Sequence, residues 1–284
     1  MVKLGAILRL TRFEHSLMLI VAVVAAELLS GGIPQAPIAL LSIVTPVFLS
    51  MSAFAVNDYF DIKVDRENGK KRPLVTGELK PSDALNITII TMAIGLIGGL
   101  FINWYCFAIA LIFGAISLLY SYRLKEIPLL GNAYVALSMA IPFIFGDYVV
   151  SQTLLPVIVL VFFLVFVSGL GREIDGTIRD FRGDRKRKAL TLPMLIGIRP
   201  SAYLGFFLYV AAIEISIHLY LAVAPFMGNL VYGVPIFVSD AMLLYSGVVF
   251  TAMQRKSYGL VRNVSLAAMG LALVGILISS VVYF

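Results

Sequence analysis

The stretch LLPVIVLVFFLVFVSGL, residues 154–170, is apolar on every face that a helix would present. A strand of a membrane barrel would instead alternate apolar and polar side chains over about ten residues. Helices buried in lipid are hydrophobic all round, because lipid offers no partners and the backbone polar groups must bond within the segment. The stretch therefore predicts a membrane-spanning helix and an all-α fold.

The composition of the whole chain supports this prediction. Sixty per cent of the 284 residues are hydrophobic and 13% are charged, whereas soluble domains are roughly half apolar and a quarter charged. Apolar stretches near the roughly 20 residues that cross a bilayer predict a polytopic membrane protein of nine transmembrane helices, forming a single domain over residues 1–284. They lie at about 14–30, 37–57, 84–103, 105–121, 129–150, 154–172, 200–224, 235–253 and 263–283.

The basic residues predict the orientation of these helices. All 22 Lys and Arg fall in alternate connections, namely the N-terminus and segments 61–80, 123–125, 172–199 and 255–262. The positive-inside rule then places the N-terminus and these loops in the cytoplasm, and Phe284 outside the cell membrane. Asp147 and Asp240 fall near the outer side, where we expect them to be solvated. The net charge of +6 is thus explained by topology and contact with membrane lipids, and we expect no nucleic acid partner.

Two polar segments, the motif loops 57–83 and 172–201, resemble each other. A shift of 119 residues superimposes Asp61 on Asp180 and Asp65 on Asp184, so the same interval of four residues occurs in both. Four predicted helices separate the two segments, so both would enter the membrane in the same orientation. The sequence therefore predicts two four-helix pseudo-repeats plus one helix, around a central cavity open to the cytoplasmic side.

The acidic residues of both segments have helical spacing. In the first segment Asn57, Asp61 and Asp65 recur every four residues, and Asp58 reaches the same side. Carboxylates this close repel one another unless a cation compensates them. Oxygen ligands without His or Cys favour a hard ion, and Mg²⁺ commonly combines one or two carboxylates with phosphate oxygens and water.

Basic residues flank these carboxylates. Arg72 follows the first cluster, Lys125 lies in the middle loop, and residues 185–188 follow the second cluster. Acidic and basic groups together indicate a metal-bridged polyphosphate, whose oxygens would be neutralised by the Arg and Lys side chains. The chain has no G-x-x-x-x-G-K-[ST] loop, so we expect a lipid-linked diphosphate rather than a nucleotide.

The motifs and their order resemble the UbiA superfamily of membrane prenyltransferases. They are N-D-Y-F-D-x-x-x-D (57–65), K-R-P-L-x-x-G (71–77), Y-S-x-x-L-K (120–125), D-x-x-x-D (180–184) and T-L-P (191–193). The resemblance implies Mg²⁺-dependent transfer of an isoprenyl group from an allylic diphosphate, through ionisation of the diphosphate and capture of the allylic cation by an acceptor. It implies catalytic roles for Asp58, Asp61, Asp65, Asp180 and Asp184, metal binding by Asn57, Asp61, Asp180 and Asp184, diphosphate binding by Arg72, Lys125, Lys188 and Tyr120, and acceptor binding by Arg12.

The acceptor is the finer question. Residues 171–193 are similar to the archaeal branch of the superfamily that transfers a geranylgeranyl group to geranylgeranylglyceryl phosphate in ether-lipid biosynthesis. TRFEHSLML, residues 11–19, is similar instead to the branch that prenylates an aromatic acceptor such as 4-hydroxybenzoate in quinone biosynthesis. We expect the glycerol ether and keep the aromatic ring as the alternative. A secondary transporter, which can also carry repeats and intramembrane carboxylates, is a distant alternative.

Overall fold

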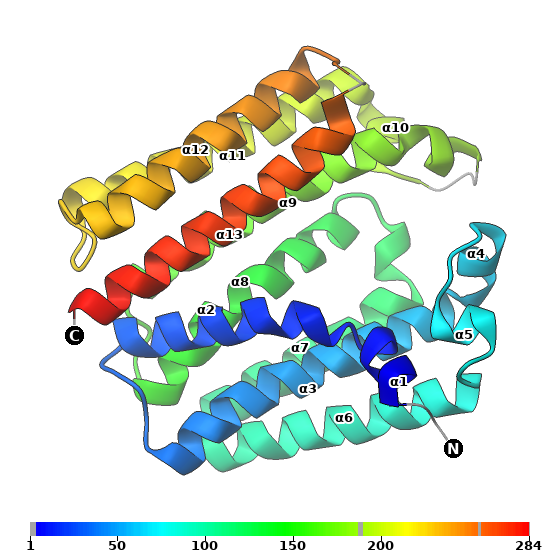
Figure 1. Ribbon diagram of the computed structural model, residues 1–284, viewed down its shortest axis with the longest axis horizontal. Coiled ribbons are helices and arrows are strands. Elements are labelled where there is room, and N and C mark those ends of the chain that lie inside the picture. The colour runs from blue at the N-terminus through cyan, green and yellow to red at the C-terminus, as the bar shows by residue number, and fades with distance from the viewer. Residues whose placement is uncertain (1–3, 187–189, 255–256, 284) are drawn as a thin grey trace. The chain divides into compact units, whose positions relative to one another are not determined.

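A computed structural model describes residues 4–186, 190–254 and 257–283. These residues form helices and contain no strand, which confirms the all-α prediction. The chain divides into two compact units (Figure 1), a first unit of Met1–Val23 with Ile33–Leu124 and a second unit of Val24–Gly32 with Lys125–Phe284. Each unit contains one of the two acidic motifs. The prediction of a single domain stays a prediction.

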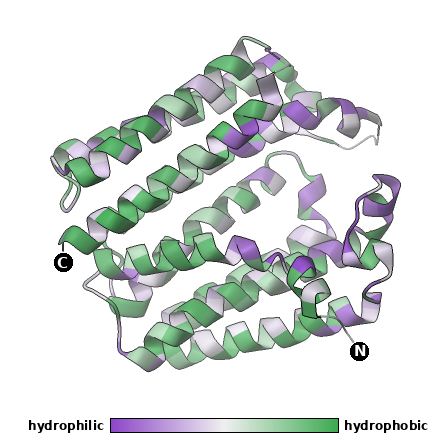
Figure 2. Ribbon diagram, in the orientation of Figure 1, coloured by the Kyte–Doolittle hydropathy of each residue, from purple (hydrophilic) through white to green (hydrophobic). Residues whose placement is uncertain are grey.

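Eight of the described helices are long and apolar enough to cross a membrane. Figure 2 shows hydrophobic residues along most of their length and hydrophilic residues near some of their ends. These eight candidate spans confirm the prediction, made from the composition, that the chain is a polytopic membrane protein. The eight helices are α3 (Ala36–Phe60), α6 (Pro81–Ile102), α7 (Trp104–Tyr122), α8 (Leu130–Val150), α9 (Pro156–Lys186), α11 (Ile198–Ala222), α12 (Leu230–Thr251) and α13 (Tyr258–Tyr283).

The first predicted helix, 14–30, is shorter than expected. It comprises a single 3₁₀ turn, η1 (Phe13–His15), and α2 (Ser16–Leu29), which has 14 residues. A span of the bilayer needs about 20 residues. The residue before η1, Arg12, has a left-handed backbone with φ 46° and ψ 50°, which breaks the helical path. The count of nine spans therefore stays a prediction.

Three short helices lie at one end of α3 and α6 in the first unit, where polar residues gather (Figures 1 and 2). Leu10 and Leu74, from two of them, share one buried cluster with Ala55 of α3 and Ala84 of α6. This cluster fixes the short helices, and with them the first acidic motif, against the ends of the long helices. The three are α1 (Leu4–Leu10), α4 (Ile62–Glu67) and α5 (Pro73–Thr76).

Helices α3 and α6 pack closely because glycines on α6 face α3. A Cβ added at Gly95 would lie 2.7 Å from Leu49 Cγ and 3.1 Å from the Thr45 carbonyl oxygen. Small residues allow such close approach between membrane helices, whose association depends on van der Waals packing. Gly95 therefore helps to set the separation of the two helices.

We expect Gly95→Val to destabilise the protein by about 1–3 kcal/mol, as overpacking of a core typically does. Thermal unfolding in detergent would show a midpoint several degrees lower. Ala93→Val enlarges a side chain on the exposed face of the same helix and should leave the midpoint unchanged. Equal midpoints for the two variants would contradict the close packing at Gly95.

The second acidic motif lies on a helix, although the sequence predicts a loop over 172–201. Helix α9 continues to Lys186, and α10 (Leu192–Ile196) follows. The helix persists because Ile174 and Ile178 bury one side of it in a cluster that includes Phe250. The charged residues occupy its other sides.

Asp147 and Asp240 are buried, so the expectation that they are solvated is wrong. Asp147 accepts hydrogen bonds from the Ser30 hydroxyl at 2.5 Å and from the Leu155 backbone N–H at 3.1 Å. Asp240 accepts from the Ser216 hydroxyl at 2.6 Å. Buried carboxylates are tolerated where hydrogen bonds satisfy them, and here they join neighbouring segments of the second unit.

Candidate functional site

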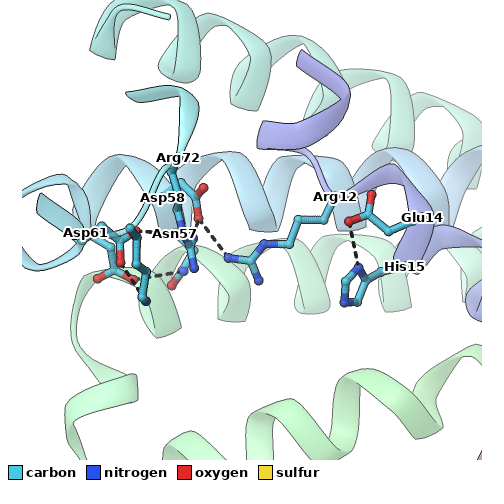
Figure 3. Close-up of polar contacts among 9 residues, drawn as sticks. Arg12, Glu14, His15, Asn57, Asp58, Asp61 and Arg72 are labelled. Atoms are coloured by element: carbon cyan, nitrogen blue, oxygen red, sulfur yellow. Dashed lines mark hydrogen bonds and ion pairs between the residues drawn. The ribbon is translucent and has the colours of Figure 1, made fainter. Parts of the chain in front are cut away.

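The first acidic motif crosses the junction between α3 and α4. Asn57 Nδ2 donates a hydrogen bond to Asp61 Oδ2 at 3.1 Å (Figure 3). The backbone N–H of Asp61 bonds to the Asn57 carbonyl, and that of Asp65 to the Asp61 carbonyl, so helical hydrogen bonding continues across the junction. Asn57 and Asp61 therefore lie side by side on one face, as their four-residue spacing predicts.

Asp58 lies between two arginines. Its side chain is 2% exposed and accepts from Arg12 Nη2 at 3.1 Å. The same oxygen, Oδ1, also bonds to Arg72 Nη1, so one buried carboxylate holds two guanidinium groups (Figure 3). Charge-assisted bonds of this kind are among the strongest hydrogen bonds in proteins. Asp58 therefore fixes the positions of Arg12 and Arg72.

Asp65 also binds basic side chains. Its side chain is 2% exposed, Oδ1 lies 2.9 Å from Lys70 Nζ, and Oδ2 lies 3.1 Å from Arg72 Nε. Asp58 and Asp65 thus both contact Arg72. The first acidic motif therefore contains two kinds of group. Asp58 and Asp65 are buried carboxylates that pair with basic side chains, and Asn57 and Asp61 provide side-chain oxygens.

Local backbone structure explains where the two arginines point. The left-handed turn at Arg12 brings its guanidinium 4.6 Å from the centre of the Phe54 ring, within the range of a cation–π contact. Arg72 is extended because Pro73 follows it. Its carbonyl accepts from backbone N–H groups of α5, which ties Arg72 to a helix that begins with the buried residues Pro73 and Leu74.

The second acidic motif lines a cavity of about 270 Å³ within the second unit. Asp180 is exposed and pairs with its neighbour Arg179 at 2.7 Å, whereas Asp184 is buried. The structure therefore brings Asp180 and Asp184 to one cavity, as their spacing predicts. The cavity lining comprises Arg172, Glu173, Asp175, Gly176, Thr177, Arg179, Asp180, Asp184, Phe250, Arg262 and Ser265.

Sequence reasoning missed a buried pair at this cavity. The hydroxyl of Tyr209, on α11, donates to Asp175 Oδ2 at 2.9 Å, and both side chains are almost fully buried. Asp175 falls outside the four-residue spacing from Asp180 that identified the motif. Arg172 and Arg262 also line the cavity. From the sequence, their positive charge is explained only by the membrane topology.

The other predicted residues have simpler surroundings. Tyr120 is half-buried near the end of α7, and Lys125 is half-buried in the 3₁₀ turn η2 (Leu124–Glu126). Lys188 lies outside the described residues. The diphosphate-binding roles of these three residues stay predictions.

The chemistry of the donor groups fits Mg²⁺. No three His, Cys, Asp or Glu side chains in the described parts of the chain are grouped so that they could hold a metal. Mg²⁺ does not need such a group, because it is usually held by one or two carboxylates together with substrate phosphates and water. The Asn57 and Asp61 pair and the Asp180 and Asp184 pair each provide oxygen ligands of this kind.

These features define a class of protein. The class is that of all-helical membrane proteins with two acidic clusters, each of which is accompanied by arginines. The model of the UbiA prenyltransferase family matches residues 18–261. The chain belongs to this family of membrane enzymes.

Individual relatives are similar over nearly the full length. The chain is 37% identical, over 96% of its length and 94% of the relative, to digeranylgeranylglyceryl phosphate synthase of Archaeoglobus fulgidus. It is 29% identical, over 98% of both chains, to the enzyme of the same name from Thermococcus kodakarensis.

Solved structures share the fold. A structure described as giving insights into "the biosynthesis of Digeranylgeranylglyceryl phosphate synthase in membranes" superimposes with a TM-score of 0.83 at 26% identity, over 99% of each chain. A UbiA homolog from Archaeoglobus fulgidus bound to DMAPP and Mg²⁺ gives a TM-score of 0.68 at 18% identity, over 94% of this chain and 98% of the other.

Proposed function

We propose that the protein transfers a geranylgeranyl group from geranylgeranyl diphosphate to geranylgeranylglyceryl phosphate, in the formation of archaeal ether lipid. The observation that carries this proposal is the 37% identity, over almost the whole chain, to a digeranylgeranylglyceryl phosphate synthase. The acidic and basic clusters support it, because they suit a metal-bound diphosphate and an anionic acceptor.

Mg²⁺ bound by Asn57, Asp61, Asp180 and Asp184 would neutralise charge on the departing diphosphate. In the same proposal, Arg72, Lys125 and Lys188 donate to the diphosphate oxygens and stabilise the negative charge that develops as the C–O bond ionises. Tyr120 contacts the same group. The hydroxyl oxygen of the acceptor then captures the allylic cation and releases its proton to water.

Arg12 is proposed to bind the phosphate of the acceptor. Asp58 and the Phe54 ring hold its guanidinium, so little side-chain entropy would be lost on binding. Residues 11–19 also resemble the branch with an aromatic acceptor, whose carboxylate Arg12 could pair with in the same way. An assay of product formation with each acceptor in turn distinguishes the glycerol phosphate acceptor from the aromatic acceptor.

The proposed topology has nine spans, with α2 as the first. The N-terminus and both acidic motifs would face the cytoplasm, because the 22 Lys and Arg of the chain fall in alternate connections. Phe284, which is not among the described residues, would be on the opposite side of the cell membrane. The central cavity open to the cytoplasmic side is part of the same proposal.

The deciding assay incubates purified protein with geranylgeranyl diphosphate and either geranylgeranylglyceryl phosphate or 4-hydroxybenzoate, and identifies products by mass. We expect a product with the glycerol phosphate only, and we expect EDTA to abolish it and excess Mg²⁺ to restore it. A product with 4-hydroxybenzoate alone would assign the protein to the aromatic branch. Turnover that persists without divalent metal would contradict the proposed role of Mg²⁺.

A further inference from the structure

A second, basic groove lies in the second unit beside α9. It has a volume of about 960 Å³ and is lined from three helices, α9, α11 and α13. Arg179 also lines the cavity of the second acidic motif, but no other described lining residue is shared by the two. The groove therefore adjoins the cavity of the second acidic motif but, apart from Arg179, has its own described lining residues.

The charge of the groove is positive. Arg179, Arg182 and Arg185 recur at three-residue intervals on α9, and no carboxylate is among the described residues that line the groove. Arg179 donates to Asp180, whereas Arg182 and Arg185 are exposed and form no ion pair within the described parts of the chain. Their charge is available to an anion.

The walls of the groove are apolar. Ile178 of α9, Ile198 of α11 and Tyr258 of α13 line it, and Tyr258 stacks on Phe250 at a centroid distance of 4.3 Å. Gly259 opens the groove further, because a Cβ added there would meet nothing within 4 Å. Apolar walls beside arginines suit an anionic lipid better than a soluble anion.

The groove also lies where membrane-spanning segments end. Ile198 and Tyr258 are the first residues of two candidate spans, and the arginines lie on the charged part of α9 that follows its apolar stretch. The polar headgroups of a bilayer lie at the level where its apolar spans stop. A lipid in the surrounding leaflet would therefore present its headgroup near Ile198 and Tyr258, which line the groove together with the arginines.

We propose that this groove binds an anionic membrane lipid through its phosphate. Arg182 and Arg185 donate to the phosphate oxygens in charge-assisted hydrogen bonds, and the lipid chain lies against Ile178, Ile198 and Tyr258. The proposal depends on the membrane location of the protein and not on the reaction that it catalyses.

The test is native mass spectrometry of the full-length protein released from detergent micelles with defined lipids. We expect a dialkylglycerol phosphoglycerol, whose anionic headgroup differs from that of the proposed product, to be retained, and the dialkylglycerol phosphocholine with the same chains to be retained about tenfold less. Arg182→Gln combined with Arg185→Gln should lower retention of the phosphoglycerol lipid at least about tenfold. Arg123→Gln, a change of charge at another exposed arginine, should leave it unchanged.

Two further variants test whether the lipid is retained in the groove or in the candidate active site. Gly259→Leu fills the groove without changing its charge and should also reduce retention. Asp61→Ala alters the candidate active site at a residue that does not line the groove and should retain the lipid fully. The proposal is overturned if the double arginine variant binds as the wild type does, if Asp61→Ala removes the lipid, or if inorganic phosphate displaces it at equal concentration. The last result would identify a plain phosphate site.

Discussion

Asp61→Ala and Asp180→Ala are each expected to lower kcat/KM for prenyl transfer by at least about 10³-fold, because each removes a charged oxygen ligand proposed for Mg²⁺. Asp61 accepts a hydrogen bond from Asn57 at 3.1 Å, and Asp180 lines a cavity with Asp184. Without either carboxylate, charge on the departing diphosphate would be less well compensated. The rate of product formation at saturating Mg²⁺, followed by mass, measures the effect.

The dependence on Mg²⁺ separates a metal ligand from a structural residue. Asp61→Asn and Asp180→Asn keep the volume of the side chain, so their thermal midpoints should match that of the wild type while the Mg²⁺ concentration for half-maximal rate rises. Glu67→Gln removes an exposed carboxylate from α4 and should leave both quantities unchanged. Near-normal turnover of either alanine variant would refute the proposed metal site.

The proximity of the residues within each acidic pair could be predicted because helical periodicity is a local property of the sequence. Asn57 and Asp61 are four residues apart and so are Asp180 and Asp184, and a helix brings such pairs to one face whatever surrounds it. The same reasoning correctly predicted that long apolar stretches form helices, because lipid leaves the backbone no other partners.

The environment of the site could not be predicted, because it depends on contacts between distant segments. Arg12 reaches Asp58 across 46 positions of sequence, and Tyr209 reaches Asp175 across 34. No spacing rule connects residues so far apart. The left-handed backbone at Arg12 was equally hidden, since an arginine gives no local signal for that conformation.

Asp58→Ala is the second variant expected to have a large effect, a loss of at least about 100-fold in kcat/KM. Asp58 is 2% exposed and joins Arg12 and Arg72, and removal of one partner from a buried ionic group typically costs about 3–5 kcal/mol. If Arg12 binds the acceptor and Arg72 the diphosphate, the KM values for both substrates should rise together. Steady-state kinetics with each substrate varied in turn would show this.

Arg12→Ala provides the comparison that tests the shared role of Asp58. It should raise the KM for the acceptor and leave that for geranylgeranyl diphosphate nearly unchanged. Because Asp58 acts partly through Arg12, the double variant should lose less than the sum of the two single losses, expressed as free energies. Losses that simply add, or an Asp58→Ala enzyme with both KM values unchanged, would show that Asp58 does not position the two arginines for binding.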